Sequence, residues 1–545
     1  MKKAVIIGSG ISGLSCAISC AEKGIKSILV SPFVSERSQS VLAAGGINAA
    51  FDSFNEGDSI ESHIEDTLKG GRYIAGKKAV TGLCKSAPDI VNWLESLGTL
   101  FTRNDKGNPD QRAFGGQSHK RTCFCGASTG KQIVSSLVME ARKYESLGLI
   151  ERRLWCDFYA ALIDDGICYG AIIYNEASLS LEIIYADALV MAVGGQNTLF
   201  GKTTGSTMCD GFAAGKLFTQ GVELKNLEFI QYHPTTIETA QKKMLISEAV
   251  RGEGGRLYYL KDGKRVYFME ERFGKDGNLM PRDVVSRCIY ECKRDVFLDI
   301  SFLGEDQIDK RIPEVRDLCK KYINLDISKE SIKVSPSVHF FMGGIAVGLN
   351  HESSIKRLYA IGECASIYHG ANRLGGNSLL AAIYSGKIAA NDIENSTAFA
   401  SKDGLFKAFF EDENKNLAKM FKSDSKFPVM YVRSLLAESM NKNLAISRNE
   451  QALKAGIEDI SYYLSVVDKI KYDSSVLAYF NYSVVGILTL AKAILLSANE
   501  RKESRGAHFR SDYPVECDDF KAASVVSYNG GDIKVRFDKE GQYEV

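Results

Sequence analysis

The feature that most constrains the fold is a glycine triplet near the N-terminus, set between an apolar run and a helical pattern. Gly8 allows a tight turn, Gly10 lets the backbone approach a pyrophosphate, and Gly13 permits close packing of the helix. The helix N-terminus would then present its positive end to phosphate groups. The segments expected to form strand, helix and strand are 4–7, 11–23 and 27–30. This β-α-β unit predicts a dinucleotide site rather than a purely structural turn.

The choice of dinucleotide depends on the end of the second strand. It ends at Val30-Ser31, without the acidic residue that binds the ribose of NAD. Further glycine-containing segments follow at 43–46, 192–195, 204–206, 210–211 and 361–363. Each alone is compatible with an ordinary turn. Together, these backbone approaches suit one long, extended ligand, so the sequence favours FAD.

Composition limits the remaining function classes. The 545 residues allow two to four units at roughly 100–200 residues per domain. A net charge of +1 gives no overall field for nucleic acid, so attraction of an anion must come from local arginines. The thirteen cysteines are scattered, without a C-x-x-C pair or a cluster-binding run. We therefore expect no metal site, no nucleic-acid partner and reduced thiols in the cytoplasm.

Further segments predict the order of elements along the chain. Helical patterns occupy about 59–71, 76–97 and 128–146, and strands fill 148–193. A hairpin around 258–267 lies in a segment of different character, which we interpret as an inserted domain. A strand at 358–362 and a helix at 378–393 follow, then a lysine-rich helical region to about 505 and short strands in the tail.

Two apolar stretches bear on localisation. The run 4–7 is too short for the apolar core of a signal peptide. The stretch 476–493 is interrupted by Asn481, Tyr482, Ser483 and Lys492, which favours a bundle helix over a membrane span. The sequence therefore predicts a cytoplasmic protein, on one face of any membrane it serves.

A set of longer motifs resembles those of a known family, the flavoprotein subunits of succinate dehydrogenases and fumarate reductases. This family also includes L-aspartate oxidase. The resemblance runs from residue 4 to about 514. Its motifs are 231–235 (QYHPT), 247–255 (SEAVRGEGG), 281–283 (PRD), 339–344 (HFFMGG), 369–379 (HGANRLGGNSL) and 504–508 (SRGAH). Such a set in this order is far more specific than one glycine triplet.

The resemblance implies an α/β fold with a discontinuous Rossmann-like FAD-binding domain, an inserted α+β capping domain and a C-terminal helical domain. The boundaries expected are 1–224 and 336–395 for the FAD-binding domain, 225–335 for the capping domain, 396–513 for the helical domain and 514–545 for the tail. The residues expected to contact FAD are Gly8, Gly10, Gly13, Ser31, Ser38, Gly45, Gly46, Asp210, Glu363, Ser378 and Leu379.

The resemblance also implies an active site that interconverts fumarate and succinate. His233, Ser247, His339 and Arg373 would hold the two carboxylates. Hydride would pass from flavin N5, with Arg282 as proton donor and Glu248 and Arg251 as the relay from solvent. The residue chemistry agrees, because an arginine can bind a carboxylate through two parallel hydrogen bonds.

Taken alone, some of these residues would fit structural roles. His233 before Pro234 could be a satisfied structural histidine, and Arg282 beside Asp283 could form a surface ion pair. The joint spacing of the motifs favours the carboxylate clamp instead.

One departure from the family pattern concerns the flavin link. In many members a histidine of an Arg-Ser-His motif carries FAD covalently, and here the matching stretch is Arg37-Ser38-Gln39. Gln39 has no nucleophilic nitrogen, so we predict non-covalent FAD. An alkylated flavin is the better electron acceptor. The absence of a covalent bond to FAD therefore favours the fumarate-reducing direction.

The strongest alternative is L-aspartate oxidase, which also binds FAD non-covalently. Aspartate oxidases place a glutamate where this chain has Phe114, to pair with the substrate ammonium. Phe114 cannot form that ion pair but can pack against a vinyl carbon, which favours fumarate or succinate. Ala44 departs from both groups, which usually have glutamine or glutamate there. Ala44 therefore leaves the substrate preference open.

Electrons must come from outside the chain, because it carries no cluster motif and no second nucleotide fingerprint. The resemblance implies a separate iron–sulfur subunit, with or without a membrane anchor that would hold the complex on the inner face of the cell membrane. A third hypothesis is a non-catalytic FAD-binding partner protein. Such a protein would be expected to lack a clamp residue, whereas all of them are present.

Overall fold

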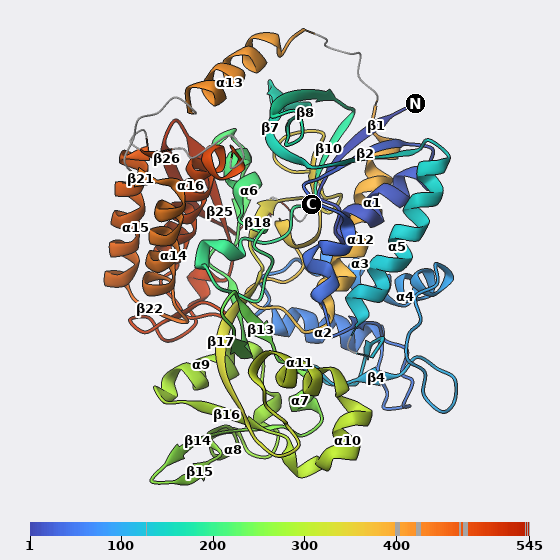
Figure 1. Ribbon diagram of the computed structural model, residues 1–545, viewed down its shortest axis with the longest axis vertical. Coiled ribbons are helices and arrows are strands. Elements are labelled where there is room, and N and C mark those ends of the chain that lie inside the picture. The colour runs from blue at the N-terminus through green and yellow to red at the C-terminus, as the bar shows by residue number, and fades with distance from the viewer. Residues whose placement is uncertain are drawn as a thin grey trace.

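The computed structural model describes residues 1–126, 128–397, 404–420, 427–467, 470–471, 478–539, 541 and 543. Figure 1 shows three masses: a parallel sheet with its helices at the upper right, a lower lobe around β14–β17, and upright C-terminal helices at the left.

The nucleotide-binding core is a five-stranded parallel sheet. Its order is β19 (Leu358–Ala360), β10 (Ala188–Met191), β1 (Lys3–Ile7), β2 (Lys26–Ser31) and β6 (Ile150–Leu154). The three central strands each contain at least three consecutive apolar residues, as expected for strands covered on both faces. The predicted strand–glycine–helix start is present, and β19 joins the sheet from far along the chain.

Helices cover this sheet. α1 (Ile11–Glu22) follows the glycine turn and packs on α12 (Asn377–Asn395), where Ser15 Oγ donates to Ile383 O at 3.0 Å. α2 (Ile60–Gly70) and α5 (Thr129–Ser146) form close to the predicted positions. The single helix predicted at 76–97 is wrong, because the chain forms α3 (Lys77–Lys85) and α4 (Ala87–Ser96). Pro88 lacks a backbone N–H and so begins a new helix instead of continuing one.

The strands predicted in 148–193 are completed by an antiparallel sheet of β7 (Cys156–Asp164), β8 (Ile167–Asn175) and β9 (Ser180–Tyr185). The remaining short elements are β3 (Ile47–Asn48), β4 (Gln111–Arg112), β5 (Thr122–Cys123), α6 (Phe212–Thr219), β21 (Phe427–Pro428), β22 (Ser447–Arg448), β23 (Ile470–Lys471) and β24 (Phe509–Arg510).

The lower lobe is built on a six-stranded sheet with its own hydrophobic core. The strand order is β13 (Lys243–Leu245), β12 (Ile230–Glu238), β17 (Ile332–Phe341), β16 (Val296–Asp299), β14 (Arg256–Lys261) and β15 (Lys264–Val266). β14 and β15 form the predicted hairpin. The helices of the lobe are α7 (Ala249–Gly252), α8 (Phe268–Phe273), α9 (Arg282–Cys292), α10 (Gly304–Arg311) and α11 (Pro313–Ile323).

The C-terminal third contains α13 (Lys407–Met420), α14 (Val429–Asn443), α15 (Glu450–Ser465) and α16 (Ala478–Glu500). α16 is long and apolar enough to cross a membrane, but 78% of its most apolar window is buried in the protein, as in a bundle helix. Residues 476 and 477 of the predicted helix lie outside the described residues.

The tail forms the predicted strands, β25 (Ala523–Asn529) and β26 (Asp532–Asp538). They extend a sheet that also contains β11 (Leu224–Lys225), β18 (Gly344–Ala346) and β20 (Ala365–Ser366). The end of the chain is thereby paired with a strand that precedes the lower lobe.

Candidate functional site

Nearly all residues predicted for the site line one long cavity of about 500 Å³. It runs from the glycine turn after β1 to a group of arginines beside the lower lobe. Of the predicted residues, only Gly13 and Arg251 do not line it. The turn after β1 and the segment after β19 lie at the carboxyl ends of parallel strands, where α/β sheets bind their ligands.

The glycine turn leaves a backbone cradle at one end of the cavity. Gly8 has φ of +108°, and a Cβ there would lie 2.2 Å from Ala192 O. A Cβ on Gly13 would lie 1.9 Å from Gly8 O, so this glycine acts by letting α1 approach the turn. Gly10 faces the cavity beside Ser40, whose Oγ accepts from Ile11 N at 3.2 Å. The helix N-terminus and bare backbone suit a pyrophosphate.

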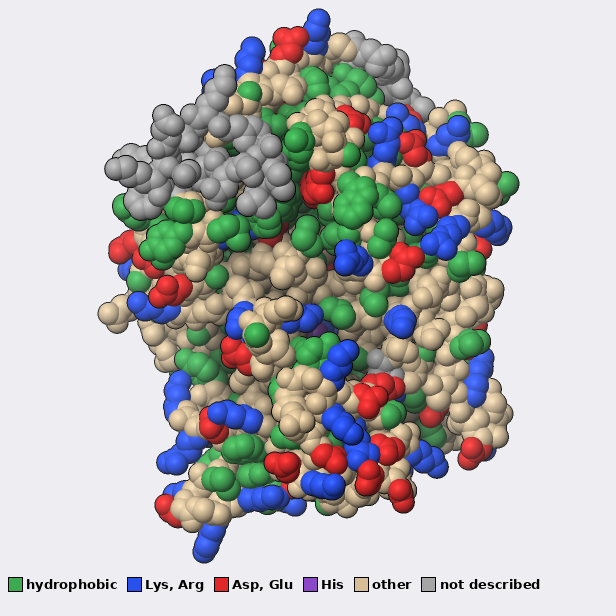
Figure 2. All heavy atoms as spheres, viewed as in Figure 1, with side chains coloured by type: hydrophobic (Ala, Val, Ile, Leu, Met, Phe, Trp, Pro, Cys, Tyr) green, Lys and Arg blue, Asp and Glu red, His purple; other side chains and the backbone are tan. Residues whose placement is uncertain are grey.

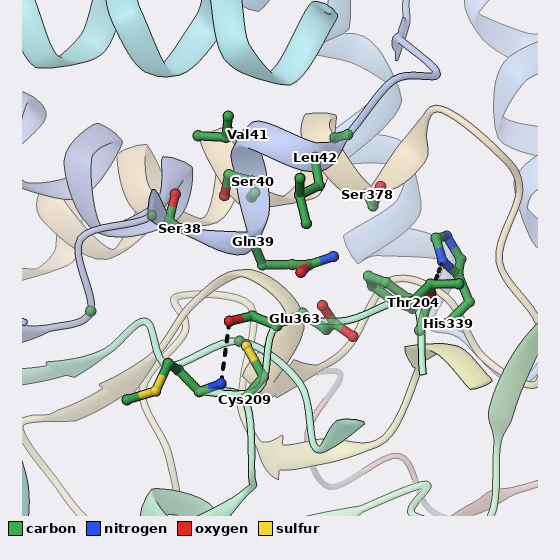
Figure 3. Close-up of a pocket in the computed structure, with 18 of the residues that line it drawn as sticks. Ser38, Gln39, Ser40, Val41, Leu42, Thr204, Cys209, His339, Glu363 and Ser378 are labelled. Atoms are coloured by element: carbon green, nitrogen blue, oxygen red, sulfur yellow. Dashed lines mark hydrogen bonds between the residues drawn. The ribbon is translucent and has the colours of Figure 1, made fainter. Parts of the chain in front are cut away.

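Polar groups without protein partners follow along the cavity. Among the described residues, Ser38 Oγ and Gln39 Oε1 are buried without a hydrogen bond. Figure 3 shows Gln39, from the short 3-10 helix Gln39–Leu42, and Glu363 reaching into the same space from opposite sides. Glu363 Oε1 accepts from Phe341 N at 3.1 Å, and burial raises the pKa of Glu363 to about 7. These orphaned groups fit a ligand rich in hydroxyl and carbonyl groups, such as FAD.

Asp210 lines the cavity, but its carboxylate is already engaged by the protein. It accepts from Tyr479 OH at 2.8 Å, from Phe212 N at 3.0 Å and from Arg433 Nη2 at 3.2 Å. Asp210 therefore ties α14 and α16 to the cavity wall. Ser31, Gly45, Gly46, Ser378 and Leu379 line the cavity as expected.

The arginine end is organised around one buried carboxylate. Glu248, just before α7, accepts from Arg282 Nη2 at 2.6 Å and from Arg251 Nη2 at 3.1 Å. Gly115 N donates to the same group at 3.1 Å. Burial alone would raise the pKa of Glu248, but the charges of Arg282 and Arg251 outweigh it and hold that pKa at about 2. Glu248 is thus an anion fixed between two guanidinium groups.

Gln231, for which the sequence analysis proposed no role, joins the two cavity arginines. Its Oε1 accepts from Arg282 Nη1 at 3.0 Å and from Arg373 Nη2 at 2.9 Å. Its Nε2 donates to Asn372 Oδ1 and to the backbone of Arg373. The only sequence signal was its place in the 231–235 motif, two residues before His233.

Arg373 carries the second positive charge of this end. Its guanidinium lies 4.1 Å from the centre of the Phe340 ring, and its Nε has no partner among the described residues. Burial and the nearby Arg282 lower the pKa of Arg373 to about 9. A buried cation in this setting is stabilised by an anionic ligand.

Two histidines complete the polar wall. The rings of His233 and His339 are 5.3 Å apart, centre to centre. His339 Nδ1 is 2.9 Å from Thr204 Oγ1, a second partner missed from the sequence, and His233 Nε2 is buried without a partner among the described residues. Burial, followed by the neighbouring arginine charges, lowers the pKa of His233 well below its usual range. Burial, the neighbouring His233 and the charges of Arg282 and Arg373 also depress the pKa of His339, so both rings are neutral hydrogen-bonding groups near neutral pH.

An aromatic ring and a hydroxyl group also line this end of the cavity. Phe114 is buried, and its ring lies 3.2 Å from where a Cβ on Gly45 would stand. Ser247 lines the cavity, and its Oγ accepts from Ala249 N at 3.2 Å. This end of the cavity therefore combines two arginines, two neutral histidines and an aromatic face, a set that can bind a small dianion.

Comparison with known proteins agrees with this geometry. Residues 3–379 match the family described as FAD binding domain, and residues 433–542 match the family Fumarate reductase flavoprotein C-term. The succinate dehydrogenase flavoprotein subunit of Bacillus subtilis is 36% identical over 94% of this chain and 92% of its own length. One subunit of the fumarate reductase (CoM/CoB) of Methanothermobacter marburgensis is 32% identical, with 96% of each chain covered.

Solved structures show the same similarity. A quinol fumarate reductase of E. coli superposes with a TM-score of 0.89 at 28% identity, covering 98% of this chain and 97% of its own. These matches confirm the predicted α/β fold, with its FAD-binding and C-terminal helical parts, and they confirm FAD as the cofactor.

Proposed function

Since this chain belongs to the family of flavoprotein subunits of succinate dehydrogenases and fumarate reductases, we propose that it interconverts fumarate and succinate in the fumarate-reducing direction. The chain is an oxidoreductase of that family. The observation that carries the proposal is Gln231 Oε1, which accepts from Arg282 at 3.0 Å and from Arg373 at 2.9 Å beside the Glu248 carboxylate. This arrangement concentrates positive charge where a dicarboxylate would lie.

The first task of these residues is to hold two carboxylates. Arg373 Nε and His233 Nε2 are buried without partners among the described residues, so both can hydrogen-bond a substrate oxygen without breaking an existing bond. His339, Ser247 and the Arg373 guanidinium offer further contacts along the same wall. Clamping a carboxylate out of the plane of the double bond makes the bond more electrophilic.

The second task is proton delivery. When bound, reduced FAD supplies a hydride at N5. Arg282 would give its proton to the carbon next to the one that receives the hydride, and its positive charge would stabilise the developing carbanion. An arginine can act in this way only if it is re-protonated at once, because its pKa exceeds roughly 12. The hydrogen bonds of Glu248 with Arg282, at 2.6 Å, and with Arg251, at 3.1 Å, support that relay.

The proposed direction follows from Gln39. Its side chain lines the cavity, and the sequence resemblance matches it to the histidine that carries FAD covalently in many family members; an amide cannot form that bond. A flavin without the alkyl substituent has the lower potential, which favours electron flow to fumarate. L-aspartate oxidase is the alternative, and the buried ring of Phe114 disfavours it because it offers no charge to an ammonium.

Electrons would arrive from another protein. The relatives from Bacillus subtilis and Methanothermobacter marburgensis are both named as subunits, which supports assembly with a partner. The donor we propose is an iron–sulfur subunit, with or without a membrane anchor. The complex would lie in the cytoplasm or on the inner face of the cell membrane.

An anaerobic assay of the purified flavoprotein with a reduced viologen dye tests the function. Fumarate, related enoates and aspartate are compared, and fumarate should be reduced fastest. Arg282→Gln should lower the rate about 10²- to 10⁴-fold while the protein stays yellow. Arg287→Gln, a change on the same helix outside the cavity, serves as the control. Faster aspartate oxidation, or full activity of Arg282→Gln, would overturn the proposal.

A further inference from the structure

We propose that Lys242 and Lys243 form a cationic entrance that draws the dicarboxylate into the cavity. This inference rests on the proposed function and goes beyond the clamp. Both lysines line the same cavity as Arg282 and Arg373, and both are partly exposed, so they stand at its rim. They follow the turn between β12 and β13, which is closed by Thr239 N donating to Lys242 O at 3.0 Å.

The two ammonium groups are not neutralised by the protein. Within the described ranges, no carboxylate lies within 4.0 Å of either Nζ atom, and Lys243 Nζ reaches only Pro336 O, at 3.5 Å. Partial burial lowers the pKa of both lysines; for Lys243, Glu238 offsets part of this effect. A partly buried cation without a counter-ion is unfavourable unless an anion passes or binds there.

The hairpin that carries these lysines is attached to the substrate wall. Lys243 N donates to Thr203 O at 3.2 Å, and the next residue, Thr204, holds His339 through its Oγ1 at 2.9 Å. The entrance and the clamp are therefore joined through two neighbouring backbone positions. A dianion captured at the rim would then enter the cavity that His339 also lines.

Figure 2 shows this face of the molecule, with a hollow between the upper part and the lower lobe and several lysine or arginine side chains around it. The lining of the cavity also includes apolar Leu42, Val315 and Leu318, and the carboxylate of Glu314. Cationic groups set against low-dielectric walls focus the field and raise the association rate of anions. The lysines would thus act on capture of the substrate, not on its reduction.

The test is the double variant Lys242→Gln/Lys243→Gln of the full-length protein. We expect kcat/KM for fumarate to fall about tenfold at low ionic strength, with kcat unchanged. The difference from the wild type should vanish near 1 M salt, where the screening length is about 3 Å. Lys329→Gln/Lys415→Gln removes the same charge from exposed sites outside the cavity and should have little effect.

A second readout does not need turnover. Stopped-flow association of succinate with the oxidised flavoprotein, followed by flavin absorbance, should slow to the same extent in the double variant. The inference is overturned if the association rate of the double variant and its salt dependence match those of the wild type. It is also overturned if the association rate of the control variant falls as far as that of the double variant. A wild type that binds succinate but reduces no fumarate would overturn the proposed function, but it would not contradict the inference about the lysine entrance. A wild type that does not bind succinate would overturn both.

Discussion

At the scale of single residues, two carboxyl groups that line the cavity, Glu248 and Glu363, differ because of their neighbours. Glu248 has two arginines within 3.1 Å, and their charges hold its pKa at about 2. Glu363 accepts one backbone hydrogen bond and interacts with the charge of Arg373 only at longer range. Burial outweighs both effects and raises the pKa of Glu363 to about 7. In the resting site the first group is ionised near neutral pH, whereas the second titrates there.

This difference predicts a pH-dependent stability of the FAD-free protein. When folding raises the pKa of a carboxyl group, the group stabilises the folded state at low pH. This contribution is complete at pH values below the ordinary pKa, near 4.5. That contribution is lost as the pH rises to about 7. The free energy of unfolding of the apoprotein, measured by thermal unfolding, should therefore decrease as the pH rises through this range. The Glu363→Gln variant should not show this decrease. An equal slope in both proteins would contradict the assignment.

Gln39 gives a second prediction at this scale. An amide side chain cannot bond covalently to the flavin, so acid precipitation should leave a colourless pellet and a yellow supernatant. The measurement is the flavin absorbance of the two fractions. A yellow pellet after washing would show a covalent link through another residue and would remove the argument for the fumarate-reducing direction.

The sequence predicted the members of the site but not all of their contacts. Gln231 lay inside a recognised motif, yet its role depends on Arg282 and Arg373, which are 51 and 142 residues away in the chain. No spacing rule connects such positions. Thr204 was noticed only as part of a glycine-containing turn, because its partner His339 is 135 residues away.

At the scale of elements, local sequence patterns predicted the helices and strands correctly where one residue type determines the backbone conformation. The glycine triplet placed the first strand and helix correctly. The helix predicted at 76–97 failed because the apolar pattern continues across Pro88, and the proline outweighs the pattern. β12 shows the limit of such rules, since its pairing with β17 is irregular after Gln231 and after His233. Irregularities of this kind re-aim side chains and leave no clear mark in the sequence.

The contact between α1 and the glycine turn gives a prediction for an element. A Cβ on Gly13 would lie 1.9 Å from Gly8 O, so Gly13→Ala must push the helix away from the turn that holds the pyrophosphate. We expect loss of most bound FAD and a destabilisation of about 3 kcal/mol or more. FAD content and thermal unfolding are measured.

Gly24→Ala is the matched control for that experiment. It has a positive φ of +71° but no atom within 4 Å of the added Cβ. It should cost only about 1–2 kcal/mol and keep FAD. Normal FAD content in Gly13→Ala would contradict the packing argument.

At the scale of the whole molecule, the substrate end is assembled from distant parts of the chain. Arg282 and His233 come from the lower lobe, Arg373 from the segment before α12, and Phe114 from the segment before β5. Gln231 is the side chain that bonds to both arginines. A dicarboxylate bound between these parts would hold them together more firmly than the protein does alone.

Ligand-dependent melting tests this expectation. A dicarboxylate at about one hundred times its Kd should stabilise the FAD-loaded protein by about 2.7 kcal/mol, seen as a rise in Tm. The same ligand should have little effect on the apoprotein, because in the proposed function bound FAD would complete the site. Arg373→Gln should abolish the rise while retaining FAD. An unchanged rise in that variant would place the binding site elsewhere.

The order of strands in the parallel sheet has a consequence for synthesis of the chain. β19 pairs with β10, yet residues 192–357 separate them, so a nascent chain leaves the edge of β10 unpaired until residue 360 has emerged from the ribosome. Glu363, Ser378 and Leu379 emerge later still. The complete cofactor site can therefore form only after residue 379 of 545 has emerged. Until then, the unpaired edge of β10 is a site at which the nascent chain can aggregate.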